Sequence, residues 1–284
     1  MLKFSYVPTS IRLLAIDIDG TLLDPASQIS PANLEALRRA RESGVEIVLV
    51  TGRRYRFALP IARELGCDLW LISSNGAVIR STGGETFFRD LMPVSRARHI
   101  CAAMLEFRSS TVITFDVDEE GALVVESVAG FDPGIQRWME KNAAHIRTVV
   151  PLEDALVADP IQVAFAGSLE RMARVEARLQ DSGLDGHITV LRTRYPARDL
   201  CFVDVLNGGC SKGHALERWA RHRGLEPRQV MAIGDNYNDV EMLEFAGVPV
   251  IMGNAAEDLK QNGWAITRSN DQDGVAAALE EFLR

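Results

Sequence analysis

Two blocks of the sequence, one near each end, alternate short apolar runs with segments of helical periodicity. In the first block, the apolar run LLAIDI at 13–18 precedes a helical pattern at 30–44, and VEIVLV follows at 45–50. Ser30 followed by Pro31 is typical of a helix N-terminus. Continuous apolar runs are typical of strands that are buried on both faces of a parallel sheet. This block therefore predicts consecutive β-α-β units.

The second block repeats the alternation toward the C-terminus. Apolar runs at 229–234, 248–253 and 264–269 alternate with helical patterns at 237–247, 255–263 and 273–284. Together the two blocks predict one α/β unit with a doubly wound, mostly parallel, Rossmann-like sheet.

Between the blocks the pattern changes. Two apolar runs at 111–117 and 121–127 are separated by turn residues and predict a hairpin. Further strands are expected at 161–167, 187–193 and 199–206, with an amphipathic helix at 168–183. These elements predict an α+β domain inserted into the α/β core. We expect core segments at 1–84 and 201–284, and the inserted domain at 85–200.

Composition excludes several classes of protein. A formal charge of −8 argues against a general nucleic-acid binder, because such proteins carry basic surfaces. No uncharged run approaches the roughly 18 residues that a membrane helix needs. The four cysteines form neither a CxxC pair nor a Cys/His cluster, which favours a reducing compartment over a zinc site. We expect a soluble cytoplasmic protein, monomeric or homodimeric, that binds neither nucleic acid nor membrane.

Polar residues follow three of the predicted parallel strands. Asp17 and Asp19 end the first strand, Thr51-Gly52-Arg53 follows the second, and Gly234-Asp235 follows a strand of the second block. Ligands of open α/β sheets bind beyond the carboxyl ends of the strands, so these residues are expected to meet at one edge. Taken singly, each segment is also explained as a turn or a helix start.

Two other motifs are excluded. Neither acidic segment is an EF-hand loop, because Tyr237 occupies the third position counted from Asp235 and neither segment has glycine at the sixth. The segment GGCSKG lacks the G-K-[ST] order of a phosphate-binding P-loop.

Four segments in order resemble the haloacid dehalogenase-like (HAD) phosphohydrolases, in particular the Cof-type branch with a large C2-type α+β cap. The resemblance is carried by DIDGTLLD from Asp17, VTGR ending at Arg53, SKG around Lys212, and GDNYNDVEML from Gly234. It covers nearly the whole chain, with the predicted insertion at the place of the family's cap. The lead-in NGGCSKG departs from the usual sequence before the lysine.

The resemblance implies specific roles for the acidic residues. Asp17 would be the nucleophile that forms an aspartyl-phosphate, and Asp19 the general acid and base. The Asp17 carboxylate, the Asp19 backbone carbonyl and the Asp235 carboxylate would bind Mg²⁺, which prefers oxygen ligands. Asp239, four residues after Asp235, would hold the site without binding the ion.

The resemblance also implies a set of phosphate-binding groups. These are the backbone N–H groups near Ile18 and at Gly52, the Thr51 hydroxyl, the Lys212 ammonium and the Asn238 amide. Arg53, Asn75 and Arg194 are candidates for contacts with the leaving group, although a basic strand segment such as that around Arg194 is more often simply solvated.

The sequence therefore predicts a Mg²⁺-dependent phosphatase of small phosphorylated metabolites, with sugar phosphates as the favoured class. A phosphohexomutase of the same superfamily is an alternative. A non-catalytic protein that binds phosphorylated metabolites is a further alternative. It would be expected to have lost a catalytic carboxylate, whereas Asp17, Asp19 and Asp235 are all present.

Overall fold

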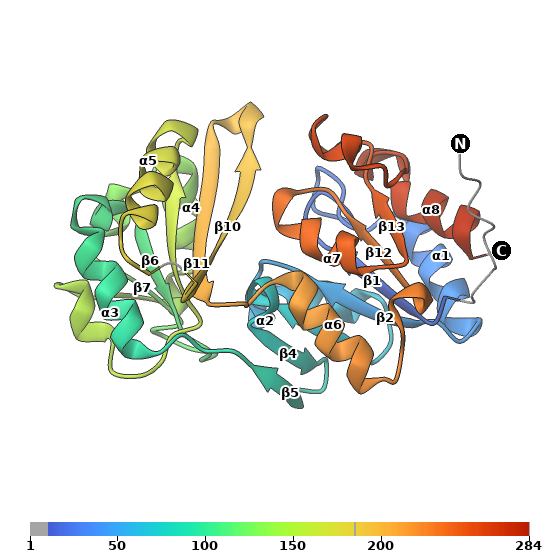
Figure 1. The fold of residues 1–284 in the computed structure, drawn as a ribbon, viewed down its shortest axis with the longest axis horizontal. Helices are drawn as coiled ribbons and strands as arrows, with labels where there is room; N and C mark the ends of the chain where they lie inside the picture. Colours follow the sequence, from blue (N-terminus) through green and yellow to red (C-terminus); the bar gives the residue numbers. More distant parts are fainter. Residues whose placement is uncertain (1–10, 185, 284) are drawn as a thin grey trace. The chain divides into compact units, whose positions relative to one another are not determined.

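The computed structural model describes residues 11–184 and 186–283. The chain forms two compact units. The first unit takes in the chain up to Phe87 and again from Lys212, and the second unit is Phe88–Ser211. Each unit is built around its own sheet (Figure 1).

An eight-stranded sheet forms the first unit within the described residues. Its order is β14 (Ala265–Ile266), β13 (Val248–Ile251), β12 (Val230–Gly234), β1 (Leu13–Asp17), β2 (Glu46–Val50), β3 (Trp70–Ser73), β4 (Val78–Ser81) and β5 (Thr86–Arg89). The strands from β14 to β3 are parallel, and β4 is antiparallel to β3. The predicted α/β class with a mostly parallel sheet is confirmed.

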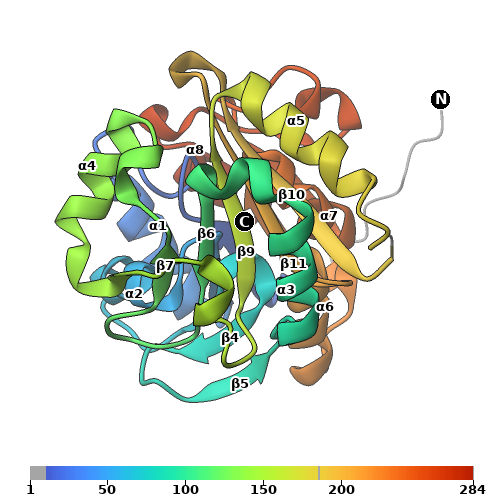
Figure 2. The same cartoon turned by 90° about the vertical axis from the view of Figure 1, so that its left-hand side faces the viewer.

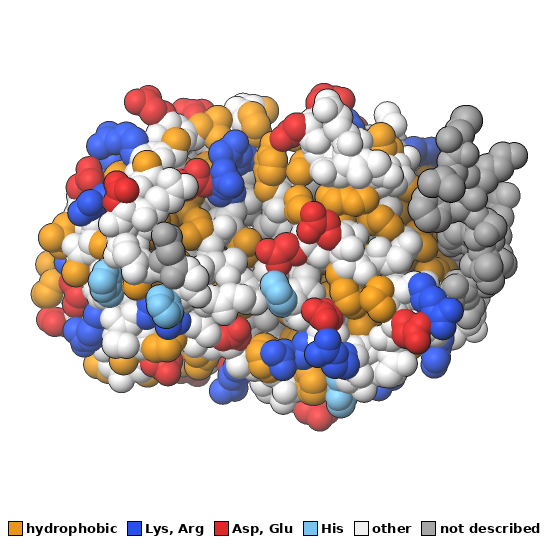
Figure 3. All heavy atoms as spheres, viewed as in Figure 1, with side chains coloured by type: hydrophobic (Ala, Val, Ile, Leu, Met, Phe, Trp, Pro, Cys, Tyr) orange, Lys and Arg blue, Asp and Glu red, His pale blue; other side chains and the backbone are white. Residues whose placement is uncertain are grey.

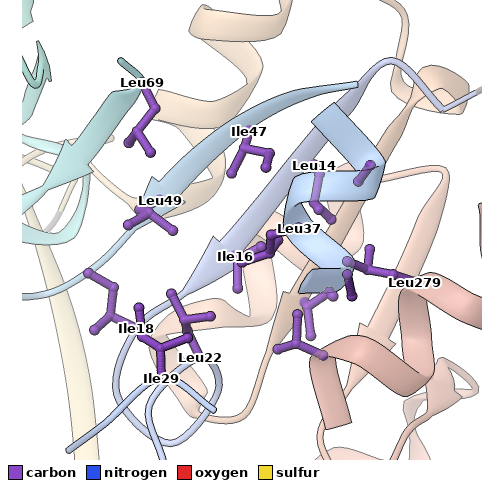
Figure 4. Packing of buried hydrophobic residues seen from close by; sticks show 14 of the residues in the cluster. Leu14, Ile16, Ile18, Leu22, Ile29, Leu37, Ile47, Leu49, Leu69 and Leu279 are labelled. Atoms are coloured by element: carbon purple, nitrogen blue, oxygen red, sulfur yellow. The ribbon is translucent and has the colours of Figure 1, made fainter. Parts of the chain in front are cut away.

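Helices cover both faces of this sheet. One face carries α1 (Pro31–Glu42), α2 (Tyr55–Glu64) and α8 (Gly274–Phe282), and the other carries α6 (Lys212–His222) and α7 (Val240–Phe245) (Figure 1). Figure 4 shows Leu14 and Ile16 of β1 packed near Leu37 of α1 and Leu279 of α8. Leu13, which points to the opposite face, is also fully buried. Burial on both faces explains why these strands are apolar throughout.

The second unit has a six-stranded sheet of mostly antiparallel strands. Its order is β10 (Ile188–Tyr195), β11 (Leu200–Asn207), β9 (Gln162–Gly167), β6 (Thr111–Thr114), β7 (Leu123–Val125) and β8 (Ile146–Thr148). Helices α3 (Val94–Ala103) and α5 (Leu169–Gln180) pack on one face, and α4 (Pro133–Lys141) packs on the other (Figures 1 and 2). The predicted hairpin corresponds to β6 and β7, which pair antiparallel.

The structure corrects three predictions. The boundary after residue 200 is wrong, because β11 pairs with β9 on one side and β10 on the other, so the second unit continues to Ser211. The first boundary also lies slightly later than predicted, after Phe87. The helix predicted at 255–263 is reduced to a 3₁₀ segment, Leu259–Asn262.

Among residues 11–184 and 186–283, no helix combines the length and the apolar character that crossing a membrane requires.

Candidate active site

The parallel strands bring Asp17 together with two acidic residues from near the other end of the sequence. Asp17 is the last residue of β1, and Asp235 directly follows β12, the neighbouring strand. Asp239 comes from the short 3₁₀ turn Tyr237–Asp239 that follows. Carboxylate oxygens of the three residues lie within 4.8 Å of one another. The three acids therefore form one cluster at the carboxyl edge of the sheet, as the strand order predicts.

Lys212 lies inside this cluster. Its Nζ donates to Asp17 Oδ1 and to Asp239 Oδ1, both at 2.6 Å. The side chain is only 1% exposed, although it begins α6 directly after the second unit. Burial alone lowers the pKa of a lysine, but the attraction of Asp17 and Asp239 outweighs it, so the pKa of Lys212 lies above its ordinary value. The ammonium group is therefore charged at neutral pH.

The carboxylates outnumber this single cation. Burial is the largest cause that raises the pKa of the Asp17 carboxyl well above its usual value, and repulsion from Asp239 and Asp235 adds to it. Burial, together with Asp239, raises the pKa of Asp235 to about 7. Three carboxylates and one ammonium group carry two surplus negative charges when all are ionised. Such a set of oxygen donors fits a divalent cation.

Two glycines allow the acids to approach so closely. A Cβ atom on Gly20, whose φ is +85°, would lie 2.3 Å from Asp235 Oδ2. A Cβ atom on Gly234 would lie 2.7 Å from Asp239 Cβ. Thr21, next to Gly20, donates its hydroxyl to Asp235 Oδ1 at 3.0 Å. Thr21 of the DGT segment thus fixes the Asp235 carboxylate, although the two residues lie near opposite ends of the sequence.

Asp239 is held mainly by protein donors. Its Oδ2 accepts from the backbone N–H groups of Asp235 and Asn236, each at 3.0 Å, and its Oδ1 accepts from Lys212. Since both carboxylate oxygens are engaged and the residue is completely buried, Asp239 fixes the turn that follows β12.

A second group of polar residues comes from the ends of β2 and β3. Asn238 Nδ2 donates to Asn75 Oδ1 at 3.0 Å. Asn75 is completely buried and has a left-handed backbone with φ +54°. A Cβ atom on Gly52 would lie 3.1 Å from the same Asn75 oxygen, so the Gly52 backbone packs directly against it. Asn75 therefore links the loop after β2 to the turn after β12.

Asp19 forms an ion pair with Arg53. Arg53 Nε donates to Asp19 Oδ2 at 2.7 Å, and Arg53 Nη2 donates to Asp19 Oδ1 at 2.5 Å. Both side chains are about one third exposed, whereas the side chains of Asp17 and Asp239 are buried. Asp19 is thus more accessible than either of these two acids.

The sequence profile of the haloacid dehalogenase-like hydrolases matches residues 14–279. The chain belongs to this family. It is 31% identical to the pyridoxal phosphate phosphatase YbhA of Escherichia coli, covering 96% of this chain and 98% of the relative. It is 32% identical to the HMP-PP phosphatase of Serratia proteamaculans, with 96% of both chains covered.

Solved structures agree with this membership. A haloacid dehalogenase-like hydrolase from Bacteroides thetaiotaomicron is 30% identical, with a TM-score of 0.78, and the match covers 96% of this chain and 99% of that one. The predicted resemblance to the haloacid dehalogenase-like superfamily is therefore confirmed. The predicted enzyme class, a phosphoric monoester hydrolase of this superfamily, is confirmed with it by the named phosphatases among the relatives.

Most residues that the motifs singled out lie in the first unit of this haloacid dehalogenase-like chain. Asp17, Asp235, Asp239 and Lys212 share one cluster. The side chain of Ile18 is part of the hydrophobic core, which leaves only its backbone for a ligand.

Two candidates for contacts with the leaving group lie outside the acidic cluster. Asn75 is completely buried and its side chain accepts from Asn238, and its predicted role stays a prediction. Arg194 lies on β10 of the second unit, and its predicted role stays a prediction.

Thr21 and Gly234 belong to the site although neither was singled out as a site residue. Thr21 follows Asp19 and Gly20 within the same motif, so its position next to the predicted sheet edge indicates that it belongs to the site. Gly234 precedes Asp235. A side chain at position 234 would collide with Asp239, but this contact arises only when the turn folds, so the sequence alone does not indicate it.

Proposed function

We propose that this chain is a Mg²⁺-dependent phosphatase of small phosphorylated metabolites that acts through an aspartyl-phosphate on Asp17. One observation carries the proposal: Lys212 Nζ lies 2.6 Å from Asp17 Oδ1 in a cluster that also contains Asp235 and Asp239. A buried cation beside a strand-end carboxylate suits the transfer of a dianionic group, because it offsets charge where a carboxylate must approach a phosphate.

In the first half-reaction, an Asp17 carboxylate oxygen attacks phosphorus, and the bond between phosphorus and the leaving-group oxygen breaks. Asp19 donates its proton to that oxygen, so the product leaves as an alcohol. In the second half-reaction, Asp19 removes a proton from water, and the water oxygen attacks phosphorus. Inorganic phosphate leaves and the Asp17 carboxylate is restored. The greater exposure of Asp19 supports this role, because it must meet both leaving group and water.

The Asp17 and Asp235 carboxylates and the Asp19 backbone carbonyl would hold the Mg²⁺ ion. Their all-oxygen character and the two surplus charges of the cluster support this assignment. When bound, the ion offsets the repulsion between the carboxylates and the phosphate dianion. We assign Asp239 to holding the site and not to the ion, since its Oδ2 accepts from two backbone N–H groups and its Oδ1 from Lys212, which fixes the turn after β12.

The remaining phosphate oxygens would be bound by donors from three loops. These are the N–H groups of Ile18 and Gly52, the Thr51 hydroxyl, the Lys212 ammonium and the Asn238 amide. Burial of Thr51, Lys212 and Asn238 supports this set, because donors fixed by the fold need no reorganisation during the reaction.

The substrate class is proposed from the relatives and the composition. Pyridoxal phosphate and HMP-PP, the substrates in the names of the two phosphatases above, are small phosphorylated metabolites. We extend this class to the present chain, with sugar phosphates as the first candidates and the second unit as the cap that selects the leaving group. Figure 3 shows acidic and basic side chains interspersed on the visible face, which suits a small substrate better than a nucleic acid. None of the four cysteines, all of which lie in the described part of the chain, forms a disulfide, which supports a cytoplasmic location.

Purified protein assayed against a panel of phosphorylated metabolites, with Mg²⁺ and with EDTA, tests the proposal. We expect Mg²⁺-dependent release of inorganic phosphate from a subset of the panel. Glucose 6-phosphate belongs in the panel, because isomerised sugar phosphate in place of free phosphate would identify a mutase. Turnover that persists unchanged in Asp17→Asn would rule out Asp17 as the nucleophile.

A further inference from the structure

We propose that Arg53 is a positioning residue that holds the Asp19 carboxylate in the orientation needed for proton transfer. The inference rests on the proposed function, in which Asp19 exchanges a proton with the leaving group and with water. It gives Arg53 a role different from the contact with the leaving group that its place in the TGR segment suggests.

The contact between the two side chains is bidentate. Arg53 Nε and Nη2 donate to different oxygens of Asp19, at 2.7 and 2.5 Å. A planar guanidinium that binds both oxygens fixes the plane of the carboxylate, whereas a single bond would leave it free to turn. Each carboxylate oxygen keeps a second lone pair. Asp19 is therefore oriented without losing its capacity to exchange a proton.

The backbone of Arg53 is anchored on both sides. Its N–H donates to Thr51 Oγ1 at 3.0 Å, and its carbonyl accepts from the Ser74 N–H at 2.8 Å. The Thr51 N–H in turn donates to the Ile72 carbonyl on β3 at 2.8 Å. Hydrogen bonds to the loop and to the buried sheet thus fix the Arg53 backbone, and the Arg53 side chain in turn binds Asp19.

Asp19 needs such a support more than the other acids do. Asp17 and Asp239 are buried and share Lys212, whereas the Asp19 side chain is 37% exposed and precedes a glycine with φ +85°. An exposed carboxylate beside a glycine samples several side-chain rotamers unless a partner selects one. Because proton transfer requires hydrogen-bond geometry, loss of the partner should slow the steps that use Asp19.

The test compares two aryl phosphates of similar shape, p-nitrophenyl phosphate and phenyl phosphate. Nitrophenolate leaves readily without a proton, while phenolate is more basic and gains more from a general acid. We expect Arg53→Gln to lower kcat/KM with phenyl phosphate by about tenfold more than kcat/KM with p-nitrophenyl phosphate, because kcat/KM depends only on the steps up to release of the leaving group. Arg56→Gln is the matched control, because Arg56 is exposed on the neighbouring helix α2, and should change neither value.

A double-variant cycle gives an independent readout. If Arg53 acts through Asp19, Arg53→Gln should cost little further activity in an Asp19→Asn background, so the two losses should not add. Equal losses with both aryl phosphates, together with additive losses in the cycle, would overturn the inference and assign Arg53 to substrate binding. Failure of the proposed function itself is distinguishable, because Asp17→Asn would then retain turnover of both aryl phosphates.

Discussion

At the scale of single residues, the geometry of the site requires glycine at positions where a side chain would not fit. Gly234 lies so close to Asp239 that a Cβ atom would sit 2.7 Å from the Asp239 Cβ and Cγ atoms. Asp239 cannot retreat freely, because it is completely buried and bonded to Lys212 and to two backbone N–H groups. Any displacement of Asp239 therefore also moves Lys212.

We predict that Gly234→Ala lowers the free energy of unfolding by about 1–3 kcal/mol, the usual cost of overpacking a core. It should also lower kcat/KM for p-nitrophenyl phosphate by at least about tenfold, because Lys212 leaves its position beside Asp17. Urea unfolding and steady-state kinetics measure the two effects. Gly83→Ala is the control, since its Cβ atom would meet only Ser81 Oγ at 3.6 Å, and it should stay within about 0.5 kcal/mol of the parent. Wild-type activity in Gly234→Ala would contradict this account of the turn.

At the scale of elements, the two chain-distant halves of the first unit are joined by packing between helices. Asn33 of α1 is 1% exposed, and its Oδ1 accepts from the backbone N–H of Ala276 in the first turn of α8 at 2.9 Å. N–H groups in the first turn of a helix have no partner within the helix. Asn33 of α1 supplies a hydrogen-bond acceptor for one of these N–H groups, although it lies more than two hundred positions earlier in the sequence.

Asn33→Ala should lower the free energy of unfolding by about 1–3 kcal/mol, because it leaves a buried N–H group without an acceptor. Chemical denaturation measures the loss, and Arg41→Ala, an exposed position of the same helix, should change stability by less than about 0.5 kcal/mol. Equal stability of the two variants would show that the bond between α1 and α8 contributes little.

The elements that could be predicted from the sequence are those marked by residues within or directly beside the element itself. Ser30 and Pro31 mark the start of α1, and the structure shows the Ser30 hydroxyl capping it by accepting from the Asn33 N–H at 3.1 Å. The apolar run at 45–50 marks β2 for the same local reason. The helix predicted at 255–263 failed because a short segment ended by glycine gains too little from packing to extend beyond a 3₁₀ turn.

The site was predictable to the extent that strand order determines it. Asp17 and Asp235 meet because β1 and β12 are parallel neighbours, which the motif order implied. The pairing of Arg53 with Asp19 and of Asn75 with Asn238 was not predictable, since each depends on how loops from different strands pack. The predicted boundary after residue 200 is wrong because β11 is an interior strand of the second sheet. The residues of β11 do not indicate which of the two sheets the strand joins.

At the scale of the whole molecule, the surplus negative charge of the site should couple metal binding to stability. If Mg²⁺ binds the folded protein only, a concentration of 100 times its Kd adds about 2.7 kcal/mol to the free energy of unfolding. We therefore predict that Mg²⁺ raises Tm at constant ionic strength and that EDTA reverses the rise. Asp235→Asn should remove the shift, while Glu85→Gln, an exposed acid in the same unit, should retain it. A shift that survives in Asp235→Asn would place the ion elsewhere.

The central claim is that Asp17 carries the phosphoryl group during turnover, and trapping that group tests it most directly. The Asp19→Asn variant is suited to this, because the phosphorylated enzyme should form from p-nitrophenyl phosphate and then hydrolyse slowly without its base. After mixing with ³²P-labelled p-nitrophenyl phosphate and Mg²⁺, acid quenching and proteolysis, the account predicts label on the peptide that contains Asp17. Label on another residue, or turnover of the substrate with no labelled peptide at any time, would contradict it.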